Sequence, residues 1–176
     1  TLLRHLSRAR ESTILNDLQL SNGLQIKEYA ILTLQHPANV DDPRVLAGML
    51  EAFLEISHEL PILFPAHAHT LERIQAEDLG DYFVDHFMDG PEPWDSRVRI
   101  RLVPPLGYLD FVQLMAHAKV VLTDSGAVQE ETTALGVPCI TLRDVTERRI
   151  TLRNGTNVLA GADPKKIDRE VFRGLR

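Results

Sequence analysis

The chain has 176 residues, of which 44% are hydrophobic and 25% charged, so it suits one globular domain or a sizeable half of a larger protein. Its formal net charge of −6, with no compensating run of Lys and Arg, argues against nucleic acid or an acidic membrane as a partner. No apolar run approaches the roughly 20 residues that span a bilayer, and the single cysteine, Cys139, excludes an intramolecular disulfide and fits a reducing cytoplasm.

Residues 1–26 predict a helix followed by a loop, a lead-in more than a core element. Because the sequence begins at Thr1 within a polar, helix-like stretch, we expect a piece of a longer protein. From residue 27 to 176, short β-branched runs alternate with amphipathic stretches, which is the pattern of βαβ units and a parallel sheet. The expected fold class is therefore α/β, with a doubly wound parallel sheet of five or six strands.

Six runs in this region predict strands, and amphipathic stretches between them predict helices. Strands are expected at 29–34, 62–65, 98–103, 119–123, 138–142 and 157–160, and helices at 45–59, 109–118, 128–135 and 164–172. Asp42 is the expected N-cap of the first of these helices, and Gly136 is the expected stop of the third. Residues 75–97, acidic and rich in aromatic residues, predict an insertion packed on the surface, with a lid as the alternative.

Polar residues follow most of the predicted strands. In an open parallel sheet, ligands bind beyond the carboxyl ends of the strands, near the N-termini of the following helices. The segments that leave the strands there are 35–39, 65–69, 104–108, 124–126 and 143–148. Their convergence at one edge of the sheet predicts a binding site.

The stretch TDSGAVQEE at 123–131 predicts an anion site at the start of a helix. Ser125 and Gly126 would offer backbone N–H groups, a hydroxyl and the positive end of the helix dipole, and Gly126 would let a phosphate approach the backbone. Glu131, more than a turn into the helix, could accept hydrogen bonds from ribose hydroxyls. The alternative is that Asp124 and Ser125 only cap the helix while the glutamates favour its dipole.

Four motifs stand in order in this half of the chain: DSGAVQEE at 124–131, LGVP at 135–138, RDVTERR at 143–149 and GT at 155–156. Together they closely resemble the non-hydrolysing UDP-N-acetylglucosamine 2-epimerases. The resemblance covers about residues 28–172 and corresponds to the C-terminal half of that family. It implies a Rossmann-like domain, the C-terminal domain of a glycosyltransferase-B-like two-domain architecture, with the family's N-terminal domain absent.

The resemblance also implies a reaction and a set of site residues. The reaction is the interconversion of UDP-GlcNAc and UDP-ManNAc by elimination and re-addition of UDP, with neither a metal nor a redox cofactor. The diphosphate would lie on Ser125 and Gly126, and the ribose on Glu131. The remaining implied UDP contacts are Phe111 against the uracil, backbone groups near Pro105, His67, and Arg143, Thr146 and Arg148 of the RDVTERR motif.

The segment after the first strand departs from the family pattern. The family carries His-Arg-x-Glu-Asn there, whereas this chain reads Gln35-His36-Pro37-Ala38-Asn39. A gapless match puts Gln35 at the position of the catalytic histidine, but hydrolysing relatives carry Gln-His-Pro with an active histidine, so His36 is the expected catalytic residue.

Because the N-terminal domain is missing, we expect this chain alone to bind UDP weakly and to show no turnover. A homodimer of the full-length protein stays open. So do two other functions, a glycosyltransferase of the same architecture and a non-catalytic protein that binds nucleotide sugars.

Overall fold

The computed structural model describes residues 2–17, 28–85, 100–103, 105–153 and 155–175. Within them, seven strands form one all-parallel sheet in the order β3-β4-β2-β1-β5-β6-β7. The strands are β1 (Ala30–Thr33), β2 (Ile62–Pro65), β3 (Val84–Asp85), β4 (Ile100–Val103), β5 (Val120–Thr123), β6 (Cys139–Thr141) and β7 (Asn157–Leu159). Strands β2, β3 and β4 lie on one side of β1, with β4 inserted between β2 and the edge strand β3, and the chain then returns to add β5, β6 and β7 on the other side. The switch point of the sheet therefore lies between β1 and β5.

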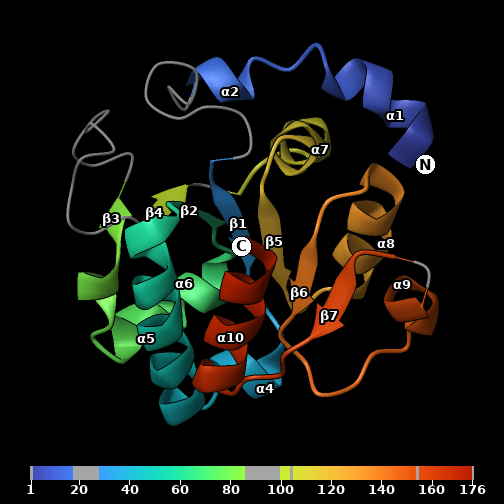
Figure 1. The fold of residues 1–176 in the computed structure, drawn as a ribbon. Helices are drawn as coiled ribbons and strands as arrows, with labels where there is room; N and C mark the ends of the chain where they lie inside the picture. The colour runs from blue at the N-terminus through green and yellow to red at the C-terminus, as the bar shows by residue number, and fades with distance from the viewer. Residues whose placement is uncertain (1, 18–27, 86–99, 104, 154, 176) are drawn as a thin grey trace.

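Helices cover both faces of the sheet (Figure 1). The helices α5 (Pro43–Glu59) and α10 (Pro164–Leu175) pack side by side on one face, and α7 (Tyr108–Ala116) and α8 (Gly126–Leu135) lie on the other. The remaining helices are α1 (Leu2–Ala9), α2 (Ile14–Asp17), α4 (Pro37–Val40), α6 (Ala68–Ala76), the 3-10 turn η1 (Gly80–Tyr82) and α9 (Arg149–Arg153). None of these helices is both long and apolar enough to cross a bilayer, among the residues that the structure describes.

The central strands contribute side chains to two separate hydrophobic cores, because successive side chains of a strand point to opposite faces of the sheet. In β1, Leu32 packs into the core beneath α5 and α10, whereas Ile31 packs into the core beneath α7 and α8. Every residue of β1, β2 and β5 is buried, as expected of strands in a parallel sheet that is covered on both sides. The predicted doubly wound sheet is confirmed.

Predicted and observed elements agree closely at the centre of the sheet and less well at its edge. Each of the six expected strands is present, and 62–65 is matched residue for residue by β2. The seventh strand, β3, lies within the segment predicted as an insertion and pairs with β4 at the edge of the sheet. A strand of two residues is too short to carry a periodic pattern. The rest of that segment, 86–97, lies outside the described residues.

The N-terminal lead-in contributes to the core more than its polar sequence suggested. Leu2, Ala9 and Ile14 are buried against α7, which α1 and α2 cross on its outer side (Figure 1). The Ser12 hydroxyl donates a hydrogen bond of 2.5 Å to Asp110 Oδ1 of α7. A narrow apolar stripe on a short polar helix is enough to anchor it here.

Two predicted helix boundaries are confirmed. Asp42 is the N-cap of α5, where its Oδ1 accepts a 2.9 Å hydrogen bond from the Arg44 N–H, and Pro43 is the first helical residue. Gly136 ends α8 in the left-handed conformation with φ of +71°, which a glycine adopts without steric cost.

Candidate functional site

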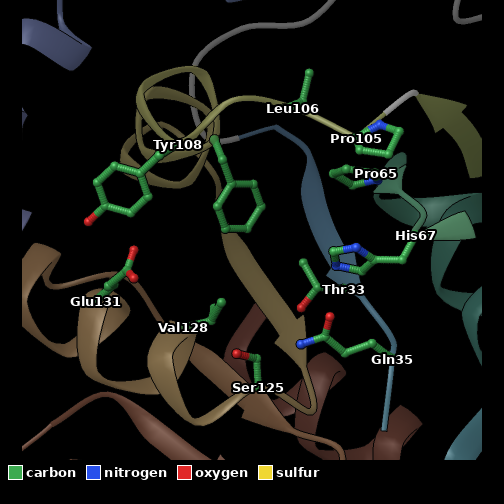
Figure 2. Close-up of a pocket in the computed structure, with 11 residues that line it drawn as sticks. Thr33, Gln35, Pro65, His67, Pro105, Leu106, Tyr108, Ser125, Val128 and Glu131 are labelled. Carbon is green, nitrogen blue, oxygen red and sulfur yellow. The ribbon is translucent and has the colours of Figure 1, made fainter.

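A cleft of about 350 Å³ opens at the switch point, beyond the carboxyl ends of β1, β2, β4 and β5 (Figure 2). Its volume lies within the range of small-molecule sites. Residues that follow these four strands line it together with residues of α7 and α8. They are Thr33, Gln35, Pro65, His67, Pro105, Leu106, Tyr108, Phe111, Ser125, Val128 and Glu131.

The start of α8 forms one wall of the cleft. Ser125 occupies the N-cap position, but its side chain makes no capping hydrogen bond and faces the cleft instead (Figure 2). Its N–H donates to Thr123 Oγ1 at 3.0 Å, and Gly126 follows as the first residue of the helix. The alternative in which Asp124 and Ser125 only cap this helix is wrong, because neither side chain does so.

Asp124 joins this helix start to the segment after β1. Only 3% of Asp124 is exposed, and its carboxylate accepts hydrogen bonds from the Gln35 N–H (3.1 Å), the His36 N–H (2.8 Å) and Asn39 Nδ2 (3.1 Å). A buried carboxylate requires such donors, since leaving water costs it several kcal/mol. The carboxylate therefore fixes the turn after β1 relative to the start of α8.

Gln35 and His36, the two candidates for the catalytic position, line different cavities. Gln35 lines the cleft (Figure 2). His36 is the N-cap of α4, where its Nδ1 accepts a 3.3 Å hydrogen bond from the Ala38 N–H, and it lines a second cavity of about 340 Å³. Of these two residues, the one that lines the cleft is thus the amide Gln35. The catalytic role expected for His36 stays a prediction, which this geometry does not support.

Further along α8, the same wall carries a carboxylate, which faces the aromatic side chains of the α7 wall. The Glu131 carboxylate projects toward the Tyr108 side chain, and its buried Oε2 has no hydrogen-bond partner among the described residues (Figure 2). Burial, followed by the charge of Glu130, raises the pKa of Glu131. Burial and the charge of Glu131 likewise raise the pKa of Tyr108. Beside them, Phe111 provides an aromatic surface, so the cleft offers an unfilled acceptor next to an apolar wall.

The three candidates from the RDVTERR motif lie in three different environments. Arg143 lines the second cavity with His36. Thr146 is buried, and its hydroxyl donates to Gln129 Oε1 at 2.6 Å. Arg148 lies at the start of α8, where its guanidinium forms a 2.8 Å ion pair with Glu130 Oε1.

The cleft therefore contains five of the ten predicted site residues: His67, Pro105, Phe111, Ser125 and Glu131. Gly126 and Arg148 adjoin it at the start of α8, since a Cβ on Gly126 would lie 3.5 Å from the Arg148 guanidinium carbon. Three further lining residues were not predicted as site residues: Thr33, Leu106 of the segment 104–108, and Val128 of the DSGAVQEE motif. Their positions, at the ends of strands β1 and β4 and one turn into α8, are the signal that could have found them.

A doubly wound parallel sheet whose switch point opens onto a Ser-Gly helix start, an acceptor carboxylate and an apolar wall is the arrangement of a Rossmann-like domain. The whole chain, residues 2–176, matches the family model described as UDP-N-acetylglucosamine 2-epimerase. The chain belongs to that family.

Individual relatives agree with this assignment. A UDP-N-acetylglucosamine 2-epimerase of Methanocaldococcus jannaschii is 38% identical over 146 residues, which are 82% of this chain and 37% of that protein. A UDP-2,3-diacetamido-2,3-dideoxy-D-glucuronate 2-epimerase of Pseudomonas aeruginosa is 35% identical over 135 residues, 76% of this chain and 33% of that protein. The chain thus spans about a third of the length of these two relatives.

The crystal structure of Methanocaldococcus jannaschii UDP-GlcNAc 2-epimerase in complex with UDP-GlcNAc and UDP has a similar fold. It matches with a TM-score of 0.82 and 34% identity, over 99% of this chain and 45% of that one. The expected fold class, a Rossmann-like doubly wound α/β domain of the glycosyltransferase-B-like kind, is confirmed.

Proposed function

We propose that this chain is the UDP-binding half of an enzyme that interconverts UDP-GlcNAc and UDP-ManNAc by elimination and re-addition of UDP. The observation that carries the proposal is the cleft at the β1–β5 switch point, which has a free helix start at one end and an unfilled carboxylate at the other. Membership of the epimerase family supports the reaction class.

The diphosphate is assigned to the start of α8. There Ser125 and Gly126 offer a hydroxyl and backbone N–H groups at the positive end of the helix dipole, and no side chain caps them. The Arg148 guanidinium lies beside Gly126 and adds a cation that suits phosphate oxygens. The Glu130 carboxylate, now paired with Arg148, would have to share that cation with the ligand.

The nucleoside is assigned to the α7 side of the cleft. Ribose hydroxyls would donate to Glu131, whose Oε2 has no partner among the described residues. The uracil would lie against Phe111, with backbone groups near Pro105 and the side chain of His67 beside it. Aromatic stacking on a base contributes about 1–3 kcal/mol.

The partners of this half are part of the same proposal. A second domain, equivalent to the remaining length of the relatives, would close over the sugar and supply the missing proton-transfer groups. The isolated chain is then expected to bind UDP without turnover, and the full-length protein would be the unit of any homodimer. The buried, unpaired thiol of Cys139 supports a reducing compartment, the cytoplasm.

Calorimetric titration of the chain with UDP, before and after Ser125→Ala and Glu131→Ala, tests the assignment. Glu59→Ala, an exposed carboxylate at the end of α5, is the matched control. Both cleft variants should weaken UDP binding about tenfold, as the loss of a hydrogen bond to a charged group predicts, and the control should not change it. Equal affinity in all four proteins would rule out the assignment.

One observation favours a second candidate, a nucleotide-sugar-binding protein without catalysis. The side chain that faces the cleft after β1 is the amide of Gln35, which does not titrate and cannot exchange a proton with a sugar carbon. An assay of the full-length protein for exchange of the sugar C2 hydrogen with deuterated water separates the candidates. Exchange supports the epimerase, and UDP binding without exchange supports the binding protein.

A further inference from the structure

A network of buried polar side chains lies behind the start of α8. It joins Gln129 of α8 to Thr146 of the loop after β6, to Asn157 of β7 and to Thr151 of α9. All four residues are at most 8% exposed. Buried polar groups are stable only when hydrogen-bonded, so this network fixes the positions of three segments relative to α8.

The direction of each hydrogen bond follows from the donors available. Gln129 Oε1 accepts from the Thr146 hydroxyl (2.6 Å) and from Asn157 Nδ2 (3.2 Å), while Asn157 Nδ2 also donates to Thr151 Oγ1 (3.0 Å). Gln129 Nε2 is buried with no partner among the described residues. The network therefore uses the oxygen of Gln129 and not its nitrogen.

Both hydroxyls in turn hold the backbone of one residue, Arg148. Its N–H donates to Thr146 Oγ1 at 3.0 Å, and its carbonyl accepts from the Thr151 hydroxyl at 2.6 Å. The side chain of Arg148 then reaches the first turn of α8 beside Gly126. Because the N–H and the carbonyl of Arg148 are both hydrogen-bonded to these side chains, the backbone from which its guanidinium extends is held in place.

We infer that Gln129 is a positioning residue, which acts through Thr146 to hold Arg148 at the phosphate end of the cleft. The inference rests on the proposed function, because Arg148 needs a phosphate to act on. A cation held in place by the protein loses less side-chain freedom on binding than a mobile one, and this improves affinity. Gln129 never touches the ligand, yet it should affect recognition of the phosphates and not of the nucleoside.

The test compares UDP with uridine, which shares the nucleoside and lacks the phosphates. Gln129→Met keeps the length of the side chain and removes the acceptor, whereas Gln129→Glu keeps an acceptor oxygen. Ser57→Ala, which removes another buried hydroxyl hydrogen bond in α5, is the matched control. Thr146→Val breaks the same link to Arg148 and serves if Gln129→Met does not fold. Each protein is titrated calorimetrically with both ligands.

Gln129→Met should weaken UDP binding on the order of tenfold, with uridine affinity changed less than about twofold. Gln129→Glu should restore the ratio of the two affinities, and Ser57→Ala should leave it unchanged. In an Arg148→Ala background, Gln129→Met should cause no further loss, since its effect passes through Arg148. The positioning role would be overturned if Gln129→Met weakened the binding of UDP and uridine equally. It would also be overturned if Gln129→Met still weakened UDP binding about tenfold in the Arg148→Ala background.

Amide hydrogen exchange measured without ligand distinguishes a failure of the positioning role from a failure of the proposed function. The Arg148 amide should exchange faster in Gln129→Met than in the wild type, while the Leu60 amide, bonded to Ile56 O in α5, should not. Unchanged exchange at Arg148 overturns the positioning role, whatever the protein binds. Absence of UDP binding by the wild-type chain overturns the proposed function instead.

Discussion

Replacing Asp124 by alanine should be among the most destabilising changes in this chain. The variant leaves the Gln35 and His36 N–H groups and Asn39 Nδ2 without the acceptor that now lies 2.8–3.1 Å away. Each hydrogen bond to a charged group contributes about 1.5–3 kcal/mol, partly offset where water reaches the exposed turn. We therefore expect a loss of about 4 kcal/mol in the free energy of unfolding, or roughly 10 °C in Tm for a domain of this length.

Urea unfolding followed by circular dichroism measures this loss, and two further variants calibrate it. Asp42→Ala removes one exposed N-cap hydrogen bond of 2.9 Å and should cost about 1 kcal/mol. Asp124→Asn keeps one acceptor oxygen, so its loss in the free energy of unfolding should lie between those of Asp124→Ala and Asp42→Ala. If Asp124→Ala costs no more than Asp42→Ala, this carboxylate does not hold the turn after β1 to the start of α8.

Three further changes test the helix and the cleft. Gly126→Ala should leave the urea midpoint unchanged, because the new Cβ would lie 3.5 Å from the nearest atom. The same Cβ should obstruct the phosphate and weaken UDP binding about tenfold. An unchanged affinity for UDP would contradict the assignment of the diphosphate to the start of α8. Gly136→Ala forces an alanine to a φ of +71° and should lower the free energy of unfolding by about 1 kcal/mol in the same assay. An unchanged free energy of unfolding would contradict the role of Gly136 as the C-cap of α8. The raised pKa of Glu131 means that the folded state keeps a proton which the unfolded state releases near 4.5, so stability falls as pH rises through that window. Glu131→Gln should remove the fall that sets in above about pH 4.5, and an unchanged pH dependence would assign it to another group.

The sheet could be predicted from the sequence because its central strands are short apolar runs with clear ends. Pro61 precedes β2 and Pro65 is its last residue, and the strand matches the prediction residue for residue. Helix α6 and strand β3 could not be predicted in the same way. The helix is mostly polar, with Thr70 and Ile74 as its buried residues, and the strand is defined only by pairing with β4. Such elements depend on tertiary contacts that leave no periodic trace.

The site was predictable where one regular element presents it and unpredictable where loops do. Ser125 is the N-cap residue of α8, and Val128 and Glu131 follow at steps of three residues, so each is the neighbour of the one before on the helix surface that lines the cleft. Arg143, Thr146 and Arg148 are neighbours in one motif, yet the loop that carries them turns each toward a different environment. The conformation of that loop follows from distant hydrogen bonds, which the motif itself does not contain.

The position of Gln35 limits the chemistry that this half of the site can supply. Inversion at a sugar carbon needs a group that takes a proton and one that returns it. Among the described lining residues that titrate, Glu131 is assigned to the ribose, and the raised pKa of Tyr108 makes it a weaker proton donor. The imidazole of His67, at the start of α6 without a side-chain capping bond, is the titratable group left within that described lining. The proposed assignment puts His67 beside the nucleoside and not the sugar, so proton transfer is expected from the proposed second domain. Under the proposed function, binding of UDP and turnover are then expected to be separable properties, carried by different halves of the full-length protein.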